Sequence, residues 1–165
     1  MREITTKEYQ DNLFEVMKSQ WALLTAGTMD KYNTMTIGWL TAGIIWGKDV
    51  VTCYVRPSRY TYQFIEDNDF FTISFYDPRY RSNLSHLGTH SGREADKVKF
   101  VDFHPIELDH TISFEEARMT IVCKKIYDQQ MDEGKMQTFG IERYYSHGDY
   151  HRFYIGEIIK IYVED

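Results

Sequence analysis

Near the N-terminus, apolar residues recur at the three- and four-residue spacing of an amphipathic helix rather than in strict alternation. The residues spaced in this way are Tyr9, Leu13, Phe14, Val16 and Met17. Ahead of them, Thr5 and Glu8 stand at the spacing of a capping box, in which each side chain bonds the backbone N–H of the other residue. We therefore expect a short amphipathic helix to follow Thr5.

From Trp21 onward the pattern changes to short apolar runs separated by turn-forming segments, and such runs predict β-strands. The predicted strands cover residues 21–27, 35–46, 49–55, 69–76, 117–131 and 150–165. The segments with a helical pattern between them are residues 59–68 and 80–88. Residues 88–100 are polar and contain glycines, so they are expected to form a loop that runs into one helical turn.

This arrangement of elements narrows the choice of fold. Six or so strands with few helices, and no regular alternation of strand and helix, indicate an antiparallel barrel or sandwich. Several of the strands are apolar on both faces. In a small barrel one face fills the interior, so another surface has to cover the outer face. A second copy of the chain is the simplest cover, and we therefore expect a homodimer.

Composition and charge exclude several classes of protein. The chain has 165 residues, of which 42% are hydrophobic, and this is enough for one domain with a core. The formal net charge of −6 argues against a nucleic-acid partner, because phosphate neutralisation needs a basic face. The first residues contain no apolar stretch of a signal peptide, and no window approaches the about 18 apolar residues of a membrane span. We therefore expect a cytoplasmic protein without membrane association.

Motifs for other chemistries are missing from the sequence. Cys53 and Cys123 lie far apart with no CxxC pattern, which predicts two buried thiols rather than a zinc site or a disulfide. The six histidines include no HxH or HExxH pair, so no metal site is expected. No GxGxxG or Walker loop and no nucleophile elbow occurs.

The first candidate for a binding function is the segment NTMTIGW, from Asn33 to Trp39. It places an amide, two hydroxyls and a glycine at the start of an otherwise apolar strand. Small polar residues and glycine let a backbone approach a flat ligand closely and direct N–H groups at its polar edge. The structural alternative is a plain turn that leads into a buried strand.

The second candidate is the segment YVRPSRYT, where a strand ends and a helix begins. Arg56, Arg59 and Thr61 gather in this first turn. Cations at a helix N-terminus oppose the helix dipole, so a purely structural design would avoid them. A bound anion would explain them, because free N–H groups, a hydroxyl and a guanidinium together make a phosphate site. The alternative is that the arginines pair with Glu66 or Asp67 on the surface.

Two further segments are weaker candidates. The loop GTHSGREADK, residues 88–97, combines glycines with a serine and two cations, which suits an anion or a lid. Solvated loops have the same composition, so this alternative stays open. His151, just before the final strand, is either a ligand-contacting residue or a structural histidine.

These segments resemble those of the flavin reductase-like, FMN-binding split-barrel family, in particular its flavoredoxin-type branch. The resemblance covers nearly the whole chain; NTMTIGW followed by VRPSRYT is its most specific pair, to which SGREADK adds. It implies a single domain over residues 1–165 that is mainly β, a Greek-key split β-barrel with a few short helices. It also implies a homodimer with FMN bound near the dimer interface.

The resemblance assigns roles to individual residues. Those that would line the isoalloxazine, mostly through backbone groups, are Asn33, Thr34, Met35 and Thr36. Those that would hold the phosphate are Ser58, Arg59 and Thr61, with Arg56 in support. Those that would close over the phosphate or the ribityl chain are Ser91, Gly92 and Lys97. Trp39 would pack near the flavin or belong to the core, and His151 would lie on the nicotinamide side.

Two positions depart from the family pattern. Leu40 stands where this branch has a glycine, and Asp49 stands where a proline is common. Leu40 is expected to narrow the space near the flavin, and this leaves the identity of the electron partner open.

The function implied by the resemblance is that of an FMN-dependent oxidoreductase. It would take electrons from NADH or NADPH and pass them to free flavin, ferric iron or a partner redox protein. A rival with the same cofactor is an FMN electron carrier that does not use a pyridine nucleotide. A rival of another class is a cofactor-free barrel whose interleaved Tyr and Arg residues stack oligonucleotide bases, which the acidic net charge disfavours.

Overall fold

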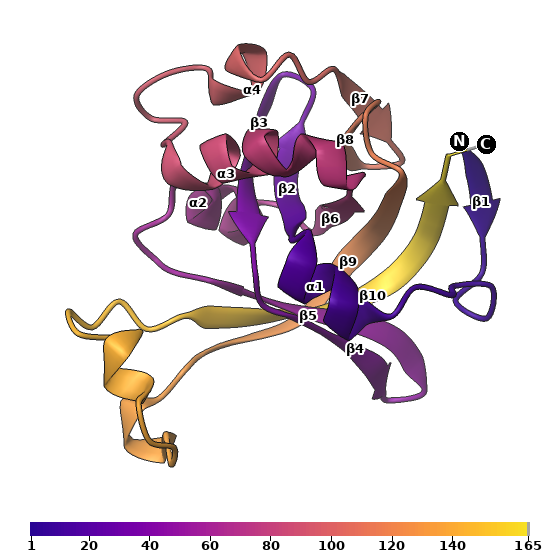
Figure 1. Cartoon of the computed structure of the whole chain (residues 1–165). Helices are drawn as coiled ribbons and strands as arrows, with labels where there is room; N and C mark the ends of the chain where they lie inside the picture. The colour runs from indigo at the N-terminus through magenta and orange to yellow at the C-terminus, as the bar shows by residue number, and fades with distance from the viewer. Residues whose placement is uncertain (165) are drawn as a thin grey trace.

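The computed structural model describes residues 1–164, which form one large sheet, a small hairpin and short helices (Figure 1). The strands are β1 (Arg2–Ile4), β2 (Ala22–Thr28), β3 (Lys31–Ile37), β4 (Leu40–Ile45), β5 (Lys48–Val55), β6 (Phe70–Phe75), β7 (Pro105–Leu108), β8 (Thr111–Phe114), β9 (Met119–Gln130) and β10 (Arg152–Val163). The α-helices are α1 (Leu13–Ser19), α2 (Tyr60–Asp67), α3 (Arg81–Thr89) and α4 (Lys97–Phe100). The short 3-10 helices are η1 (Pro78–Tyr80), η2 (Glu133–Lys135) and η3 (Ile141–Arg143).

The main sheet is antiparallel and has the strand order β3-β2-β6-β9-β10-β5-β4, with β1 added beside β10. Strands β9 and β10 are long and curved (Figure 1). They connect the β3-β2-β6 side of the sheet to the β5-β4 side. Within residues 1–164 the end strands β3 and β4 do not pair with each other, so the sheet is not closed. The prediction of a mainly β, antiparallel fold with few helices is confirmed.

The predicted strand at residues 35–46 is in fact two strands. β3 ends at Ile37 and β4 begins at Leu40, and these strands lie at opposite edges of the sheet. Gly38 and Trp39 therefore carry the chain from one edge to the other. Apolar residues stand on both sides of this junction, Met35 and Ile37 before it and Leu40 after it, so the hydrophobic pattern contains no break. The pattern also misses β1, β7 and β8, which have three or four residues each, too few to show alternation.

The first helix begins later than the sequence predicts. Asn12 is the N-cap of α1, and its side-chain oxygen accepts from the backbone N–H groups of Phe14 at 3.1 Å and Glu15 at 3.4 Å. The Glu8 carboxylate does accept from Thr5 N at 2.8 Å, as in a capping box, but the two residues close an isolated turn. Helices α2 and α3 and the single turn of α4 are close to the predicted segments.

The core has two parts on the two sides of the sheet. One cluster fills the inside of the curved sheet and includes Phe71, Ile73 and the fully buried thiols of Cys53 and Cys123. The other packs Leu84 and neighbouring side chains of α3 against the sheet and the β7–β8 hairpin. The predicted pair of buried, free cysteines is confirmed. Within residues 1–164, no helix is long and apolar enough to cross a membrane.

Candidate functional site

The three candidate segments converge on one pocket of about 260 Å³ at the start of α2. Its walls contain six of the residues assigned to FMN: Asn33, Ser58, Arg59, Thr61, Ser91 and Lys97. The remaining walls are Tyr60, Thr89, His90, Arg93 and Glu94. We call this cavity the α2 pocket. It joins β3, the N-terminal end of α2 and the loop that follows α3, segments far apart in the sequence.

Arg59 is the N-cap of α2, and it caps the helix without a side-chain hydrogen bond. The first N–H groups of a helix have no partner within the helix. Tyr60 and Thr61, which begin α2, both line the pocket. The positive end of the α2 dipole therefore faces the same cavity as the Arg59 guanidinium.

Three cations of the α2 pocket have no carboxylate partner in the described part of the chain. Arg93 is exposed and donates to Ser58 O at 3.1 Å, and the other two, Arg59 and Lys97, are at least partly buried. Arg59 is half-buried, and its guanidinium forms no hydrogen bond or ion pair with any of residues 1–164. The surface pairing with Glu66 is excluded, because Glu66 Oε1 accepts from the Tyr154 hydroxyl at 2.6 Å and lies 3.6 Å from Arg152 Nε. Burial and the neighbouring charge of Arg56 lower the pKa of Arg59.

Lys97 is the second of these cations. Its side chain is buried, with 4% exposure, and Lys97 Nζ donates to the carbonyls of Leu87 at 2.7 Å and His90 at 3.0 Å. Burial, and next the charge of Arg59, lower the pKa of Lys97 to about 8. An ammonium has three donors, so one remains for a ligand. Positive charge kept away from water without a counter-ion indicates that an anion belongs in the pocket.

The loop after α3 packs directly against β3. A Cβ atom on Gly92 would overlap Asn33 Oδ1 and would come within 3.1 Å of the Tyr60 ring, so only glycine fits this position. Asn33 Nδ2 in turn donates to Thr61 Oγ1 at 2.7 Å. Because Thr61 Oγ1 is the acceptor there, its own hydrogen is available to a ligand.

Arg56 and Ser58 face the segment before β10 as well as the pocket region. The Arg56 guanidinium donates to the carbonyls of Tyr144 at 2.6 Å and Asp149 at 3.0 Å. Ser58 Oγ donates to Asp149 Oδ2 at 2.5 Å, and Ser58 N donates to Asp149 Oδ1 at 3.2 Å. Asp149 belongs to the candidate segment Asp149-Tyr150-His151, but sequence reasoning assigned a role there only to His151, since an aspartate before a strand is typical of turns.

The other residues of the NTMT segment offer a ligand only their backbone. Thr34 is fully buried and its hydroxyl donates to Leu24 O at 3.2 Å, and Met35 is part of the core. The hydroxyl of Thr36 donates to Leu84 O at 2.5 Å. β3 pairs on one side only, with β2, so alternate N–H and C=O groups on its other side are available.

Trp39 and His151 lie together, next to the α2 pocket rather than in it. Their ring centroids are 4.4 Å apart, and the Tyr145 hydroxyl is 2.7 Å from His151 Nδ1. Burial, and next the charge of Arg56, lower the pKa of His151 to about 4, so its ring is neutral at pH 7. A separate pocket of about 260 Å³ opens here between Trp39 and residues 138–145. Tyr145 was missed because nothing in the sequence marks it among 13 tyrosines.

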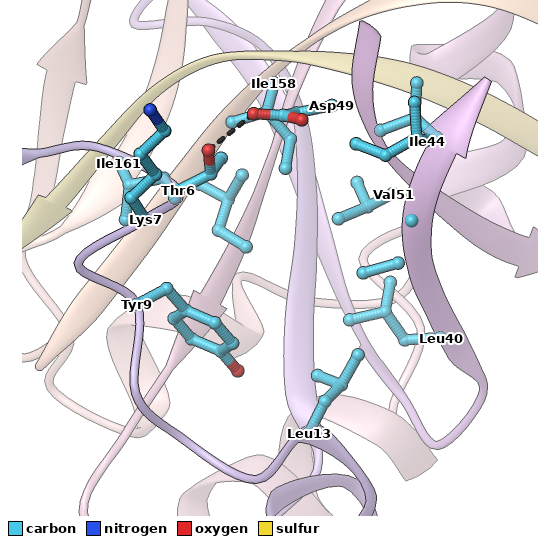
Figure 2. Close-up of a pocket in the computed structure, with 14 residues that line it drawn as sticks. Thr6, Lys7, Tyr9, Leu13, Leu40, Ile44, Asp49, Val51, Ile158 and Ile161 are labelled. Carbon is cyan, nitrogen blue, oxygen red and sulfur yellow. Dashed lines mark hydrogen bonds between the residues drawn. The ribbon is translucent and has the colours of Figure 1, made fainter. Parts of the chain in front are cut away.

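Leu40 and Asp49, the two departures from the family pattern, are not in the α2 pocket. They line a different cavity of about 370 Å³ between the segment before α1 and strands β4 and β5 (Figure 2). We call it the β4 pocket. Leu40 faces Leu13 across this cavity and does not line the α2 pocket; that it narrows the space near the flavin stays a prediction.

Comparison with known proteins gives a family match over most of the chain. The sequence model of the family described as the flavin reductase like domain matches residues 14–165. A search of curated proteins gives no significant match.

Solved structures with the same fold include two flavoredoxins and a flavin reductase. Flavoredoxin from Methanosarcina acetivorans is 20% identical, with a TM-score of 0.71 over 100% of this chain and 77% of that chain. Flavoredoxin of Desulfovibrio vulgaris (Miyazaki F) is 22% identical, with a TM-score of 0.69 over 89% of this chain and 70% of that chain. The styrene monooxygenase flavin reductase from Pseudomonas putida S12 is 12% identical, with a TM-score of 0.65 over 89% of this chain and 80% of that chain.

Proposed function

The chain belongs to the flavin reductase-like family, and from this premise we propose that it is an FMN-binding oxidoreductase of the flavoredoxin-type branch. It takes electrons from NADH or NADPH and passes them to a flavin, a ferric ion or a redox protein. The observation that carries the proposal is the pair of cations in the α2 pocket, Arg59 and Lys97, which lack a carboxylate partner in residues 1–164.

The residues of the α2 pocket fit the phosphate of FMN. Arg59 supplies a guanidinium without a partner, Lys97 a remaining N–H, and Thr61 a free hydroxyl hydrogen. Ser91 lies in the same wall, and Gly92 lets its loop lie close to Asn33. Arg56 and Ser58 support the site by holding the segment that contains Asp149. A riboflavin without phosphate would leave these donors unused.

The free edge of β3 suits the flat ring of the flavin. Every second residue of the segment Asn33, Thr34, Met35 and Thr36 presents its backbone groups along this edge, which fits the backbone contacts expected for the isoalloxazine. FMN, when bound, supplies two-electron transfer. The contribution of the chain is to bind and orient the ring, and no side-chain acid or base is required of it.

His151 is the side chain proposed to meet the electron donor. Its imidazole is neutral at pH 7, and the Tyr145 hydroxyl, 2.7 Å from Nδ1, orients it. We propose the tautomer in which Nε2 carries the proton and is a donor to the ligand. Trp39 supports it from one side. A neutral donor is suited to a nicotinamide carboxamide, since it adds no charge next to a ring that carries positive charge when oxidised.

The alternative is a flavoredoxin-like FMN electron carrier without NAD(P)H activity. Two of the structural relatives described above are flavoredoxins, and this favours the alternative. The α2 pocket serves both functions equally, because it would hold the phosphate in each. The two differ only in whether the His151 side of the site receives a pyridine nucleotide.

We also propose that residues 1–165 act as one domain and that two copies assemble into a homodimer of split barrels. Exposed aromatic and aliphatic side chains support a second copy on the outer face of the sheet. Trp46 is 68% exposed at the β4–β5 turn and lies beside Tyr127, which is 41% exposed. Ile159 is 42% exposed on the neighbouring strand β10. Sedimentation of a Trp46→Glu variant tests this: a dimer should become a monomer.

The first experiment is the absorption spectrum of the purified protein after addition of FMN and gel filtration. Flavin absorption at roughly 450 nm should co-elute with the protein. Arg59→Ala should weaken FMN binding by about 10- to 100-fold, the range for a charge-assisted hydrogen bond. Arg79→Ala is the matched control, because Arg79 is exposed and lies 3.7 Å from Asp77. A protein that retains no flavin at any FMN concentration would contradict the proposal.

Steady-state oxidation of NADH or NADPH with added FMN then separates the two candidates. Turnover with either nucleotide supports the reductase. Absence of turnover by an FMN-loaded protein supports the carrier. A colourless protein that binds single-stranded oligonucleotides in a salt-sensitive manner would instead favour the cofactor-free rival.

A further inference from the structure

The β4 pocket is a second cavity that the proposed function does not use. Its walls come from the segment before α1, from β4 and β5, and from the buried faces of β9 and β10 (Figure 2). Leu13, Leu40, Val51 and Ile161 make its surface mostly apolar. A volume of about 370 Å³ lies in the range of small-molecule sites.

One polar group in this pocket has no partner. Tyr9 Oη is screened from solvent and has no hydrogen-bond partner within residues 1–164. Figure 2 shows the Tyr9 ring pointing from the N-terminal segment into the space in front of Leu13 and Leu40. Burial raises the pKa of Tyr9, so the phenol stays protonated and is a hydrogen-bond donor without an acceptor. A buried polar group without a partner destabilises the empty protein, and a ligand with an acceptor removes this penalty.

The charged groups at the opening do not call for a charged ligand. Asp49 Oδ2 accepts from Thr6 Oγ1 at 2.5 Å, a bond that ties the N-terminal segment to β5 across the mouth of the pocket (Figure 2). Lys7 is exposed at the rim of the pocket, so its ammonium group stays hydrated. The buried and half-buried cations without counter-ions, Lys97 and Arg59, lie in the α2 pocket instead, so the ligand chemistry here is neutral.

The two departures from the family pattern build this pocket. A glycine at position 40 would remove the side chain that faces Leu13, and the cavity would lose one wall. A proline at position 49 could not accept the hydrogen bond from Thr6. The cavity therefore depends on residues that distinguish this chain from the general pattern, Leu40 and Asp49.

We propose that the β4 pocket binds a small, neutral, mostly apolar molecule with one hydrogen-bond acceptor, such as an aromatic or alicyclic ketone. The apolar body lies against Leu13, Leu40 and Val51, and the carbonyl oxygen accepts from Tyr9 Oη. The inference does not depend on FMN binding, because no residue of the β4 pocket lines the α2 pocket.

The test uses two probes of the same shape, acetophenone, which has a carbonyl oxygen, and ethylbenzene, which lacks it. Each is titrated into methyl-labelled protein, and NMR shifts of the Leu13, Leu40 and Val51 methyl groups locate the binding. Tyr9→Phe should weaken acetophenone binding by about five-fold, the value of one neutral hydrogen bond, and leave ethylbenzene unchanged. Ala42→Phe, which fills the pocket from an exposed strand position, should abolish the binding of both probes.

Controls keep the result specific to this cavity. Tyr162→Phe is the matched control, because the Tyr162 hydroxyl bonds Asp109 Oδ2 and Tyr162 does not line the β4 pocket, so it should change neither affinity. The Tyr9→Phe variant and the parent protein should have the same affinity for FMN, whatever the value of that affinity. The proposal is overturned if no saturable shifts occur at these methyl groups at millimolar probe. It is also overturned if Tyr9→Phe binds both probes as the parent does.

A second copy of the chain is the competing occupant of the pocket. In that case the same methyl groups would shift on dilution alone, and Ala42→Phe would dissociate a dimer in sedimentation. That outcome would replace the small molecule by a protein partner and would overturn the proposal.

Discussion

The α2 pocket and the β4 pocket are of similar size but differ in the groups that lack a partner. In the α2 pocket these are two buried or half-buried cations without a counter-ion, Arg59 and Lys97, beside a helix N-terminus; Lys97 bonds only backbone carbonyls. In the β4 pocket it is one phenol, Tyr9, surrounded by aliphatic side chains. Withdrawal of an unpaired charge from water destabilises a protein far more than withdrawal of a hydroxyl. The α2 pocket therefore specifies its ligand class more strongly.

A third set of buried polar groups differs from those of both pockets. Ser74, Ser113 and Thr120 are fully buried, and their hydroxyls bond one another at 2.7 to 3.1 Å. The triad joins the β7–β8 hairpin to the main sheet. Because every member has a partner, we assign it a structural role and no ligand. Burial of a polar group does not by itself indicate a ligand site. Burial of a polar group that has no hydrogen-bond partner does indicate one.

The largest expected effect is that of Lys97→Met on FMN affinity. Removal of the ammonium takes away one charge-assisted hydrogen bond, and affinity should fall by about 10- to 100-fold. The stability of the FMN-free protein should change much less, because the buried charge is removed together with its donors. FMN titration and urea unfolding measure the two quantities. Riboflavin, which has no phosphate, is the control ligand, and an equal loss of riboflavin affinity would contradict a phosphate role.

The pH dependence of binding should follow the pKa of Lys97. This pKa is about 8 in the folded protein, below the ordinary value of 10.5. Above pH 8 the folded FMN-free chain loses the proton before the unfolded chain does. Stability without FMN should therefore gain a contribution between pH 8 and 10.5, while FMN affinity should decline. The Lys97→Met variant should show neither trend. If the FMN affinity of the parent protein does not decline above pH 8, Lys97 does not contact the phosphate.

A matched pair of glycine substitutions compares the two regions directly. A Cβ on Gly92 overlaps Asn33, so Gly92→Ala should displace the loop and weaken FMN binding about several-fold. Gly43, in the β4 pocket, has open space around its Cα, so Gly43→Ala should leave FMN affinity unchanged. FMN titration of both variants measures the difference. Equal behaviour of the two would mean that the loop does not close the α2 pocket.

The smallest expected effect is a gain in stability from Tyr9→Phe. The substitution removes a buried hydroxyl without a partner and keeps the ring, so the free energy of unfolding should rise by about 0.5–1 kcal/mol. Urea unfolding without added ketone measures it, with Tyr127→Phe as the control. A loss of stability would show that Tyr9 Oη has a partner in solution, such as a water.

Much of this site could be predicted from residue types alone. Arg56, Arg59 and Thr61 at a predicted helix start indicate an anion site, and the structure places Arg59 and Thr61 in one pocket with Lys97. The surface pairing of Arg59 with Glu66 was the competing interpretation. It could not be excluded in advance, because Glu66 bonds Tyr154, a residue distant in sequence.

The sequence by itself determined the class of fold and indicated the segments that the structure brings together at the α2 pocket. Alternating apolar runs require strands, and the absence of strand–helix alternation makes the sheet antiparallel, because both signals depend on neighbours along the chain. Only the tertiary structure decided that Gly38 and Trp39 separate two edge strands, that Asp149 bonds Ser58, and that Leu40 faces a second cavity. These features depend on which distant segments pack together. No local pattern along the sequence shows which distant residue a side chain contacts.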